Sequence, residues 1–344
     1  MGDVELWLVP TALIAPSTVQ TLDQTNRKEK KLTKSPAVGW IGTGRMGSQL
    51  VQRLLNAGYD VSVYNRTASK AQPLVDRGAK LVSSPAELAD RDIVFTMVSA
   101  PKDLEAVTTG PGGLLTNPDY APRIIADSST VSVEASELLR AAAAERGTQL
   151  LATPVSGNPA VIAAGKLTVA ASGPQQAFDE VEPLLEAFGR GVTYVGDGEV
   201  ARLVKIAHNI MLGVVTQTLA EITVLVEKGG VTREAFLNFF NDSVMGSVFT
   251  QYKTPAFVNL DFAPTFTNVL LQKDFDLGLD AGRSLGVPLP VTSVTRNLVA
   301  HEVGSGNVEL DFATLLLTVA KGAGLELAPE NAVVSDGLEA SQSA

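Results

Sequence analysis

The first half of the chain alternates short apolar runs with longer segments in which apolar residues recur at helical spacing. The runs that are typical of buried strands cover residues 37–41, 59–65, 92–98, 123–127 and 149–155. Helical spacing lies between them, as at residues 48–58 and 133–147. This alternation of strands and helices predicts an α/β fold with a doubly wound parallel sheet of the Rossmann type.

From residue 200 onward the apolar pattern is helical. Residues 200–230 form one long apolar stretch that ends at a pair of glycines, and charged residues interrupt it too often for a typical membrane span. Further helical patterns cover residues 232–241, 272–286 and 291–304. Because no strand pattern separates these segments, we expect an all-α C-terminal domain.

The pattern divides the chain into four parts. We expect an N-terminal extension at residues 1–35, a Rossmann domain at 36–198, an all-helical substrate and dimerisation domain at 199–322, and a tail at 323–344. The extension joins a short apolar run to a charged run, and it lacks the basic segment that opens a signal peptide. The tail is polar and acidic. We expect both ends to be disordered.

Composition narrows the classes of function. The net charge of −10 argues against a nucleic-acid binder, which would need a basic face, although a pocket can still be locally basic. The chain has no cysteine and only two histidines, His208 and His301. Thiolate chemistry is therefore excluded, and we expect no metal site. The resulting expectation is a cytoplasmic protein that binds neither nucleic acid nor membranes.

A glycine-rich loop follows the first predicted strand and opens the first predicted helix. Gly42, Gly44 and Gly47 match the spacing G-x-G-x-x-G, and this context favours a dinucleotide site over an ordinary tight turn. The first glycine permits the turn, the second lets the backbone approach a pyrophosphate, and the third permits close packing of helix on strand. The N-terminus of the helix then attracts the anion. The residues expected to hold the cofactor here are Gly42, Thr43, Gly44, Arg45, Met46 and Gly47.

The end of the second predicted strand indicates which dinucleotide binds. NAD sites usually carry an acidic residue there, but this chain has Asn65, Arg66 and Thr67. No carboxylate would repel a 2′-phosphate, and the guanidinium can pair with one. We therefore expect NADP(H) to be favoured over NAD(H), although Arg66 could also be a solvated surface residue.

The long apolar helix carries the sequence "LVKIAHNIML", in which Lys205 and Asn209 are four residues apart and share one face. A lysine in such a helix usually extends its ammonium group to solvent. His208 is three residues from Lys205, so it could neighbour a site or be a satisfied core histidine, and we favour the second interpretation.

Four motifs in the same order resemble one family. They are "GTGRMG" at residues 42–47, "DSSTVS" at 127–132, "PVSGNPAVIAAGKL" at 154–167 together with "LVKIAHN", and "QKDFDLGLDAG" at 272–282. Over residues 36–322 the chain resembles the β-hydroxyacid dehydrogenases, which include 3-hydroxyisobutyrate dehydrogenases and several semialdehyde reductases. The resemblance implies an NADP(H)-dependent oxidoreductase that interconverts a small β-hydroxy acid and its semialdehyde or keto acid.

The resemblance also assigns roles to residues. It makes Lys205 the general acid and base and Asn209 its partner, a role that suits a lysine whose pKa is lowered by burial and neighbouring positive charge. The residues it implies for the substrate are Ser129, Ser156, Gly157, Asn158 and Phe266. Those it adds for the cofactor are Met97, Val98, Ser99, Thr130, Lys273 and Asp274.

Alternatives remain at this stage. An imine reductase shares the architecture, but those enzymes usually replace the lysine, so Lys205 argues against that activity. A catalytically inert NADP-binding interaction protein is a third possibility, and the intact Lys205, Asn209 and Lys273 argue against it. A phosphosugar acid is disfavoured as substrate, because we find no cluster of basic residues for a phosphate in the helical domain. We expect a small carboxylate substrate and, from the surplus of apolar surface, a homodimer or homotetramer.

Overall fold

The computed structural model describes residues 35–338, and its first part is a twisted sheet that is mostly parallel. The parallel strands are β1 (Val38–Ile41), β2 (Val61–Tyr64), β3 (Lys80–Leu81), β4 (Ile93–Thr96), β5 (Ile124–Asp127) and β6 (Gln149–Ala152). Their order is β3-β2-β1-β4-β5-β6. The five strands predicted from apolar runs are therefore confirmed, with shorter ends, and β3 adds an edge.

Three further strands extend the sheet beyond β6. They are β7 (Val155–Ser156), β8 (Thr168–Ser172) and β9 (Gly191–Gly196). β8 runs antiparallel to β6 and β7, whereas β9 pairs with β8 in parallel. The hairpin of β7 and β8 was not predicted, because two-residue strands and an alanine-rich run carry little apolar pattern.

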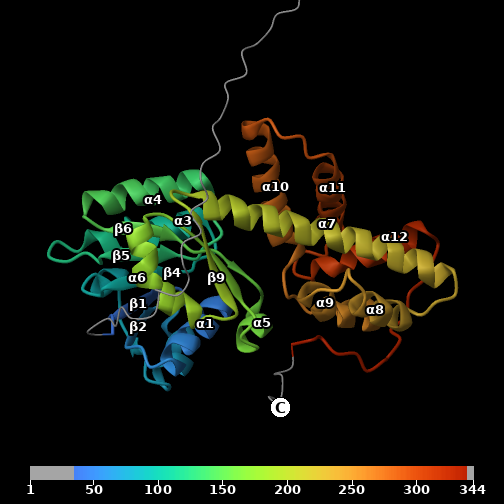
Figure 1. Ribbon diagram of the computed structural model, residues 1–344, viewed down its shortest axis with the longest axis horizontal. Coiled ribbons are helices and arrows are strands. Elements are labelled where there is room, and N and C mark those ends of the chain that lie inside the picture. Colours follow the sequence, from blue (N-terminus) through green and yellow to red (C-terminus); the bar gives the residue numbers. More distant parts are fainter. Residues whose placement is uncertain (1–34, 339–344) are drawn as a thin grey trace, which may run out of the picture. The chain divides into compact units, whose positions relative to one another are not determined.

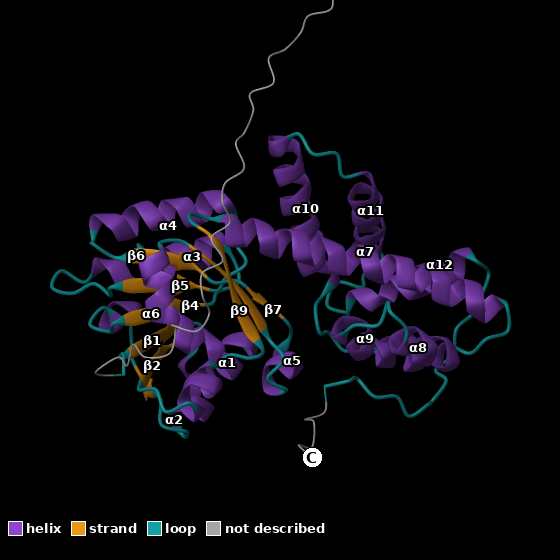
Figure 2. Cartoon of the chain, in the orientation of Figure 1, coloured by secondary structure: helices purple, strands orange, loops and turns teal. Residues whose placement is uncertain are grey.

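Helices cover both faces of the sheet, as the alternation of strands and helices predicts (Figures 1 and 2). They are α1 (Arg45–Asn56), α2 (Gln72–Val75), α3 (Pro101–Thr108), α4 (Val133–Glu145), α5 (Pro159–Ala163) and α6 (Gln175–Glu186). The apolar side chains of α1 and α6 pack against one face, and those of α3 and α4 against the other. Within β4, Ile93 and Phe95 face the first cluster and Val94 faces the second, because side chains alternate along a strand.

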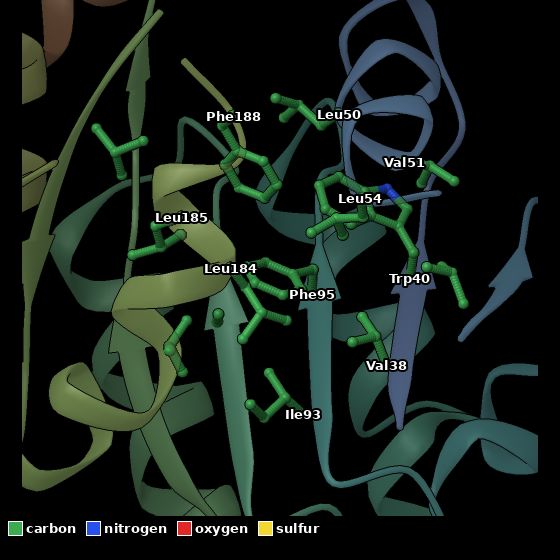
Figure 3. Packing of buried hydrophobic residues seen from close by; sticks show 14 of the residues in the cluster. Val38, Trp40, Leu50, Val51, Leu54, Ile93, Phe95, Leu184, Leu185 and Phe188 are labelled. Atoms are coloured by element: carbon green, nitrogen blue, oxygen red, sulfur yellow. The ribbon is translucent and has the colours of Figure 1, made fainter. Parts of the chain in front are cut away.

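Three aromatic rings form the centre of the first cluster (Figure 3). Trp40 stacks on Phe95 with 5.2 Å between ring centroids. Phe188, just after α6, presents an edge to both rings at 6.0 and 5.5 Å. The three side chains are fully buried, so they join β1, β4 and the end of α6 into one packed unit.

The second part of the described chain is helical, and the long helix α7 is its central element (Figure 1). The helices are α7 (Val200–Lys228), α8 (Arg233–Asp242), α9 (Val248–Asn259), α10 (Asn268–Leu285), α11 (Pro290–Gly304) and α12 (Leu315–Gly322). By length and composition alone α7 could cross a membrane, but it packs against α8, α10, α11 and α12 as a core helix does. The predicted all-α second domain is therefore confirmed.

Two glycines let α7 and α10 approach closely. A Cβ atom on Gly213 would collide with the ring of Phe275, and one on Gly278 would collide with the side chain of Ile210. The sequence predicted α7, α8, α10 and α11 but missed α9 and α12. α9 contains an internal proline, Pro255, and it has no apolar stripe on a single face.

The expected disorder of the tail is wrong for residues 323–338. Leu325 and Leu327 pack against the apolar cluster formed by α7, α8 and α12. The Glu330 carboxylate accepts hydrogen bonds from the backbone N–H groups of Arg233 and Glu234, at 2.7 and 2.9 Å. Apolar residues scattered through an acidic segment were enough to dock it. The predictions for residues 1–34 and 339–344 lie outside the described residues.

Phe188→Ala should test the aromatic centre of the sheet domain. Removing a fully buried ring that contacts both Trp40 and Phe95 should lower the free energy of unfolding by about 3–5 kcal/mol, measured by urea denaturation. Leu138→Ala is the control, because Leu138 is 75% exposed and its loss should change stability by less than about 0.5 kcal/mol. Equal effects of the two changes would contradict this account of the core.

Candidate active site

One cavity of about 630 Å³ lies at the carboxyl ends of the parallel strands, which is where ligands bind in doubly wound sheets. The Rossmann part contributes the glycine loop, the segments after β4 and β5, and the turn from β7 into α5. The helical part contributes α7, the start of α9, the loop before α10 and α10 itself. Motifs from four separate stretches of the sequence therefore meet at one place.

The predicted site residues divide into two groups. Those that line the cavity are Gly44, Arg45, Met46, Gly47, Met97, Val98, Ser99, Ser129, Thr130, Ser156, Gly157, Asn158, Lys205, Asn209, Phe266, Lys273 and Asp274. Those that do not line it are Gly42, Thr43, Asn65, Arg66 and Thr67.

The glycine loop has the geometry that a dinucleotide needs. Gly42 has φ +99°, and a Cβ there would collide with the Met97 carbonyl oxygen. A Cβ on Gly47 would collide with the Gly42 carbonyl oxygen, whereas one on Gly44 would meet only open space. Gly44 also begins α1 without any side-chain cap, so the first N–H groups of that helix remain available for an anion. Among the described residues, the buried Thr43 hydroxyl has no hydrogen-bond partner. The loop therefore fits a nucleotide diphosphate.

The residues after β2 lie beside this loop. Asn65 Oδ1 accepts a hydrogen bond from the Thr43 N–H at 3.0 Å, and Asn65 Nδ2 donates to the Thr67 carbonyl at 2.8 Å. Asn65 thus braces the glycine loop. The Arg66 side chain is 86% exposed, and its guanidinium lies 3.3 Å from the Asp103 carboxylate. It extends into solvent, where a 2′-phosphate could reach it.

A buried arginine fixes the start of α7. Arg202 pairs with Asp127 at the end of β5 at 2.7 Å, and with Glu199 at 2.9 Å. Its guanidinium also donates to the Ser129 carbonyl at 3.0 Å. Asp127 in turn accepts a hydrogen bond from the Thr96 hydroxyl at 2.6 Å. These bonds join the loop after β5 to the helix turn that precedes Lys205.

Lys205 lies in the cavity wall on the same face of α7 as Asn209. It is packed deeply among protein atoms, although the cavity keeps part of its side chain accessible. Burial lowers the pKa of Lys205 to about 8, the Asp274 carboxylate opposes that shift, and the Lys273 ammonium adds to it. A lysine in this state can give up or accept a proton near neutral pH.

α10 supplies the partners of these two side chains. Asn209 Nδ2 donates to Asp274 Oδ2 at 2.5 Å, and the other carboxylate oxygen lies 3.3 Å from the Lys273 ammonium. Lys273 also donates to the Thr130 carbonyl at 3.1 Å. Lys273 and Asp274 are thus next to Lys205 as well as to the loop after β5, and they connect the two halves of the cavity.

The sequence favoured a core role for His208, and the structure corrects this prediction. His208 lines the cavity, and its Nε2 shares a hydrogen bond of 2.9 Å with the Ser156 hydroxyl. Nδ1 lies 3.1 Å from Asn209 Oδ1. Burial and the Lys205 charge lower the pKa of His208, which favours the neutral ring. Its spacing of three residues from Lys205 was the signal for this placement.

The turn from β7 into α5 presents donors to the cavity. Gly157 has φ +143°, and a Cβ there would overlap the Val161 side chain. Asn158 caps α5 by accepting the Val161 N–H at 3.0 Å. The Asn158 Nδ2 group is buried and has no partner among the described residues, so it is free to donate to a ligand. By contrast, the Ser129 hydroxyl already accepts the Val98 N–H at 3.0 Å.

The aromatic wall of the cavity was not predicted except for Phe266. Phe266 meets Phe312 edge to face at 5.9 Å, and Phe249 stacks on Phe312 at 6.3 Å. Behind them Lys253 and Asp311 form a buried ion pair of 2.5 Å. Burial alone would raise the pKa of the Asp311 carboxyl, but the Lys253 charge together with hydrogen bonds from Lys253, Ala313 and Thr265 holds that pKa below its usual value. The two charges are 58 residues apart in sequence, so no local pattern could reveal the pair.

The fold and the site define a two-domain oxidoreductase that uses a nicotinamide dinucleotide. The sequence model of the NAD binding domain of 6-phosphogluconate dehydrogenase matches residues 37–196. The model described as NAD-binding of NADP-dependent 3-hydroxyisobutyrate dehydrogenase matches residues 196–337. The two matches meet close to the predicted domain boundary at residue 198.

Comparison with individual proteins supports the same family. The oxidoreductase YfjR of Bacillus subtilis (strain 168) is 34% identical over 280 residues, which are 80% of this chain and 97% of that protein. The 2-(hydroxymethyl)glutarate dehydrogenase of Eubacterium barkeri is 32% identical over 269 residues, which are 78% and 89% of the two chains. The structure of 3-hydroxyisobutyrate dehydrogenase from Salmonella typhimurium superimposes with a TM-score of 0.74 at 25% identity, covering 83% of this chain and 100% of that one. The chain belongs to the β-hydroxyacid dehydrogenase family and is an NAD(P)-dependent dehydrogenase.

Proposed function

We propose that this protein is an NADP(H)-dependent dehydrogenase that interconverts a small β-hydroxy acid and its semialdehyde, with Lys205 as the general acid and base. The observation that carries the proposal is the position of Lys205. It lies in the same cavity as the glycine loop, next to Asn209 and Lys273, and its pKa is lowered to about 8. The names of the relatives, which include 3-hydroxyisobutyrate and 2-(hydroxymethyl)glutarate dehydrogenases, support a β-hydroxy acid as substrate.

The residues of the cavity suit this reaction. Bound NADPH supplies the hydride that reduces the carbonyl carbon. Negative charge then develops on the carbonyl oxygen, and Lys205 Nζ donates a proton to it. In the oxidative direction the neutral amine takes the hydroxyl proton. Asn209 is held by Asp274 at 2.5 Å, so its amide can orient the oxygen without moving.

The substrate carboxylate is assigned to the turn that begins α5. Asn158 offers its unpartnered amide N–H. The Ser156 hydroxyl donates to the neutral His208 ring at Nε2, because Nδ1 carries the proton that Asn209 Oδ1 accepts, so this hydroxyl helps to fix the turn and does not donate to the ligand. The backbone N–H groups of the turn lie at the N-terminus of α5, although a helix this short adds only a local dipole. The Asn158 amide and the backbone N–H groups of the turn can thus bind the carboxylate while Lys205 remains free for proton transfer.

Imine reduction is the weaker alternative. A reductase for imines needs a group that protonates or stabilises nitrogen, and a lysine with a lowered pKa can do so. The unpartnered Asn158 amide and the backbone N–H groups beside it instead favour a substrate that carries a carboxylate. We also propose that the protein associates into homodimers or homotetramers. This proposal rests on the apolar side chains that α7 exposes, which are Val200, Leu203, Val204, Met211, Ile222 and Leu225.

Replacement of Lys205 separates catalysis from structure. Lys205→Met should leave NADPH binding nearly unchanged and lower single-turnover reduction of a semialdehyde by about 10²–10⁴. Lys205→Arg should fail almost as severely, because a guanidinium keeps its charge and cannot donate a proton near neutral pH. Lys321→Met, an exposed lysine of α12, is the matched control. Near-normal reduction by the folded arginine variant would refute the role of Lys205.

The pH dependence should follow the protonation of Lys205. Reduction needs the charged lysine, so kcat/KM for reduction should be constant at low pH and fall as pH rises through about 8. Oxidation needs the neutral amine, so kcat/KM for oxidation should rise through the same pH. Both inflections should disappear in Lys205→Met. A profile with the opposite sign in either direction would rule out this assignment.

Arg66 should decide the cofactor preference. Arg66→Asp reverses the charge that faces the 2′-position, so NADPH should bind more weakly and NADH should gain relative to it. Fluorescence titration of both cofactors measures the two dissociation constants. Arg77→Asp, an exposed change in the turn after α2, controls for net charge. Equal binding of NADPH and NADH by the unmodified protein would contradict the preference.

A further inference from the structure

The outer wall of the cavity contains two cations that the proposed chemistry does not use. Lys166 precedes β8 and Arg190 precedes β9, and both line the cavity together with Thr168. The Arg190 N–H donates to the Leu167 carbonyl at 2.7 Å, so the two segments run side by side.

Strand pairing places these cations close to Ser156. Ser156 of β7 lies directly opposite Thr168 of β8. Their Cβ atoms are therefore about 4.5–5.5 Å apart on the same face of the sheet. Lys166 is two residues before Thr168, or about 6–7 Å further along an extended chain. Because the Lys166 side chain lines the same cavity, its ammonium is within reach of a ligand whose first carboxylate is bound at this turn.

The lining of the cavity carries more positive than negative charge. Its lining includes five cations, namely Arg45, Lys166, Arg190, Lys205 and Lys273. The one carboxylate of that lining is Asp274, which Asn209 and Lys273 already occupy. This excess of positive charge occurs in a chain whose net charge is −10.

Neither outer cation is neutralised within the part of the chain that the structure describes. Lys166 Nζ donates to the carbonyl of Gly337 at 2.5 Å, which positions the ammonium but leaves its charge and its other N–H groups available. Arg190 forms no ion pair with any described residue. Its guanidinium can therefore receive a carboxylate in bidentate fashion.

We propose that Lys166 and Arg190 form a second anionic subsite, and that the substrate is a dicarboxylate. One carboxylate binds at Asn158 and the backbone N–H groups beside it, the hydroxyl-bearing carbon lies at Lys205, and the second carboxylate extends on a short chain to Lys166 and Arg190. The placement of the first carboxylate rests on the proposed function. The second subsite rests on the unpaired charges and on the register of β7, β8 and β9.

A pair of matched substrates tests the subsite by turnover. 2-(Hydroxymethyl)glutarate and 2-(hydroxymethyl)pentanoate are identical around the reacting carbon, and they differ in whether the side chain ends in a carboxylate or a methyl group. The unmodified enzyme with NADP⁺ should oxidise the dicarboxylate with a kcat/KM that is at least about tenfold higher. A higher kcat/KM for the pentanoate would overturn the proposal.

A double substitution tests whether Lys166 and Arg190 form the second subsite. Lys166→Gln/Arg190→Gln should remove the preference by lowering kcat/KM for the dicarboxylate about tenfold, and it should leave the pentanoate within about twofold. Arg77→Gln/Lys321→Gln removes the same charge from exposed positions and should leave the preference intact. An equal loss for both substrates would overturn the subsite. So would a weaker affinity for NADPH with unchanged preference, because the cations would then serve the cofactor.

Binding of unreactive ligands separates this proposal from the proposed function. Calorimetric titration of the NADP⁺-loaded protein with glutarate and with pentanoate needs no turnover. Tighter binding of glutarate that disappears in the Lys166→Gln/Arg190→Gln variant supports the subsite even if neither hydroxy acid is oxidised, in which case the proposed function alone would fail. Equal binding of the two ligands by the unmodified protein would overturn the subsite.

Discussion

The buried ion pair between Arg202 and Asp127 is the interaction on which the site depends. Both side chains are almost fully buried, and their charged groups are 2.7 Å apart. Removing Arg202 would leave the Asp127 carboxylate buried without a counter-charge, at a cost of about 3–5 kcal/mol. The pair ties the end of β5 to the first turn of α7. The position of Lys205, one turn later, is therefore set relative to the loop that carries Ser129 and Thr130.

A second connection fixes the opposite side of the cavity and sets its electrostatics. Gly213 and Gly278 let α7 and α10 pack closely, and that packing brings Asn209 and Asp274 to 2.5 Å. The same approach places Asp274 and Lys273 beside Lys205, where one opposes and the other reinforces the effect of burial on its pKa. The packing of α7 on α10 therefore adjusts a pKa that burial of the lysine lowers first.

Much of this arrangement could be predicted from local pattern. Some features depend only on residues that are close together in sequence. These are the five parallel strands, the glycine loop and the shared face of Lys205 and Asn209. The residues that were missed depend on pairing over long sequence distances. The hairpin of β7 and β8 brings Thr168, two residues after Lys166, opposite Ser156, and Lys253 meets an acid 58 residues away. The docked segment at residues 323–338 was missed because its few apolar residues are diluted by charge.

The net charge of the chain gave little information about the cavity, and the reason is the range of the forces. At about 0.1 M salt, charges more than about 10 Å apart are largely screened in water. The surface acids that produce the net charge of −10 therefore have little effect on a ligand inside the cavity. There the five cations of the lining act over short distances with one carboxylate to offset them. An acidic protein can thus hold a cavity with an excess of positive charge, because among these five cations only Lys273 forms an ion pair with a described carboxylate, and Lys166 is bonded to the neutral carbonyl of Gly337.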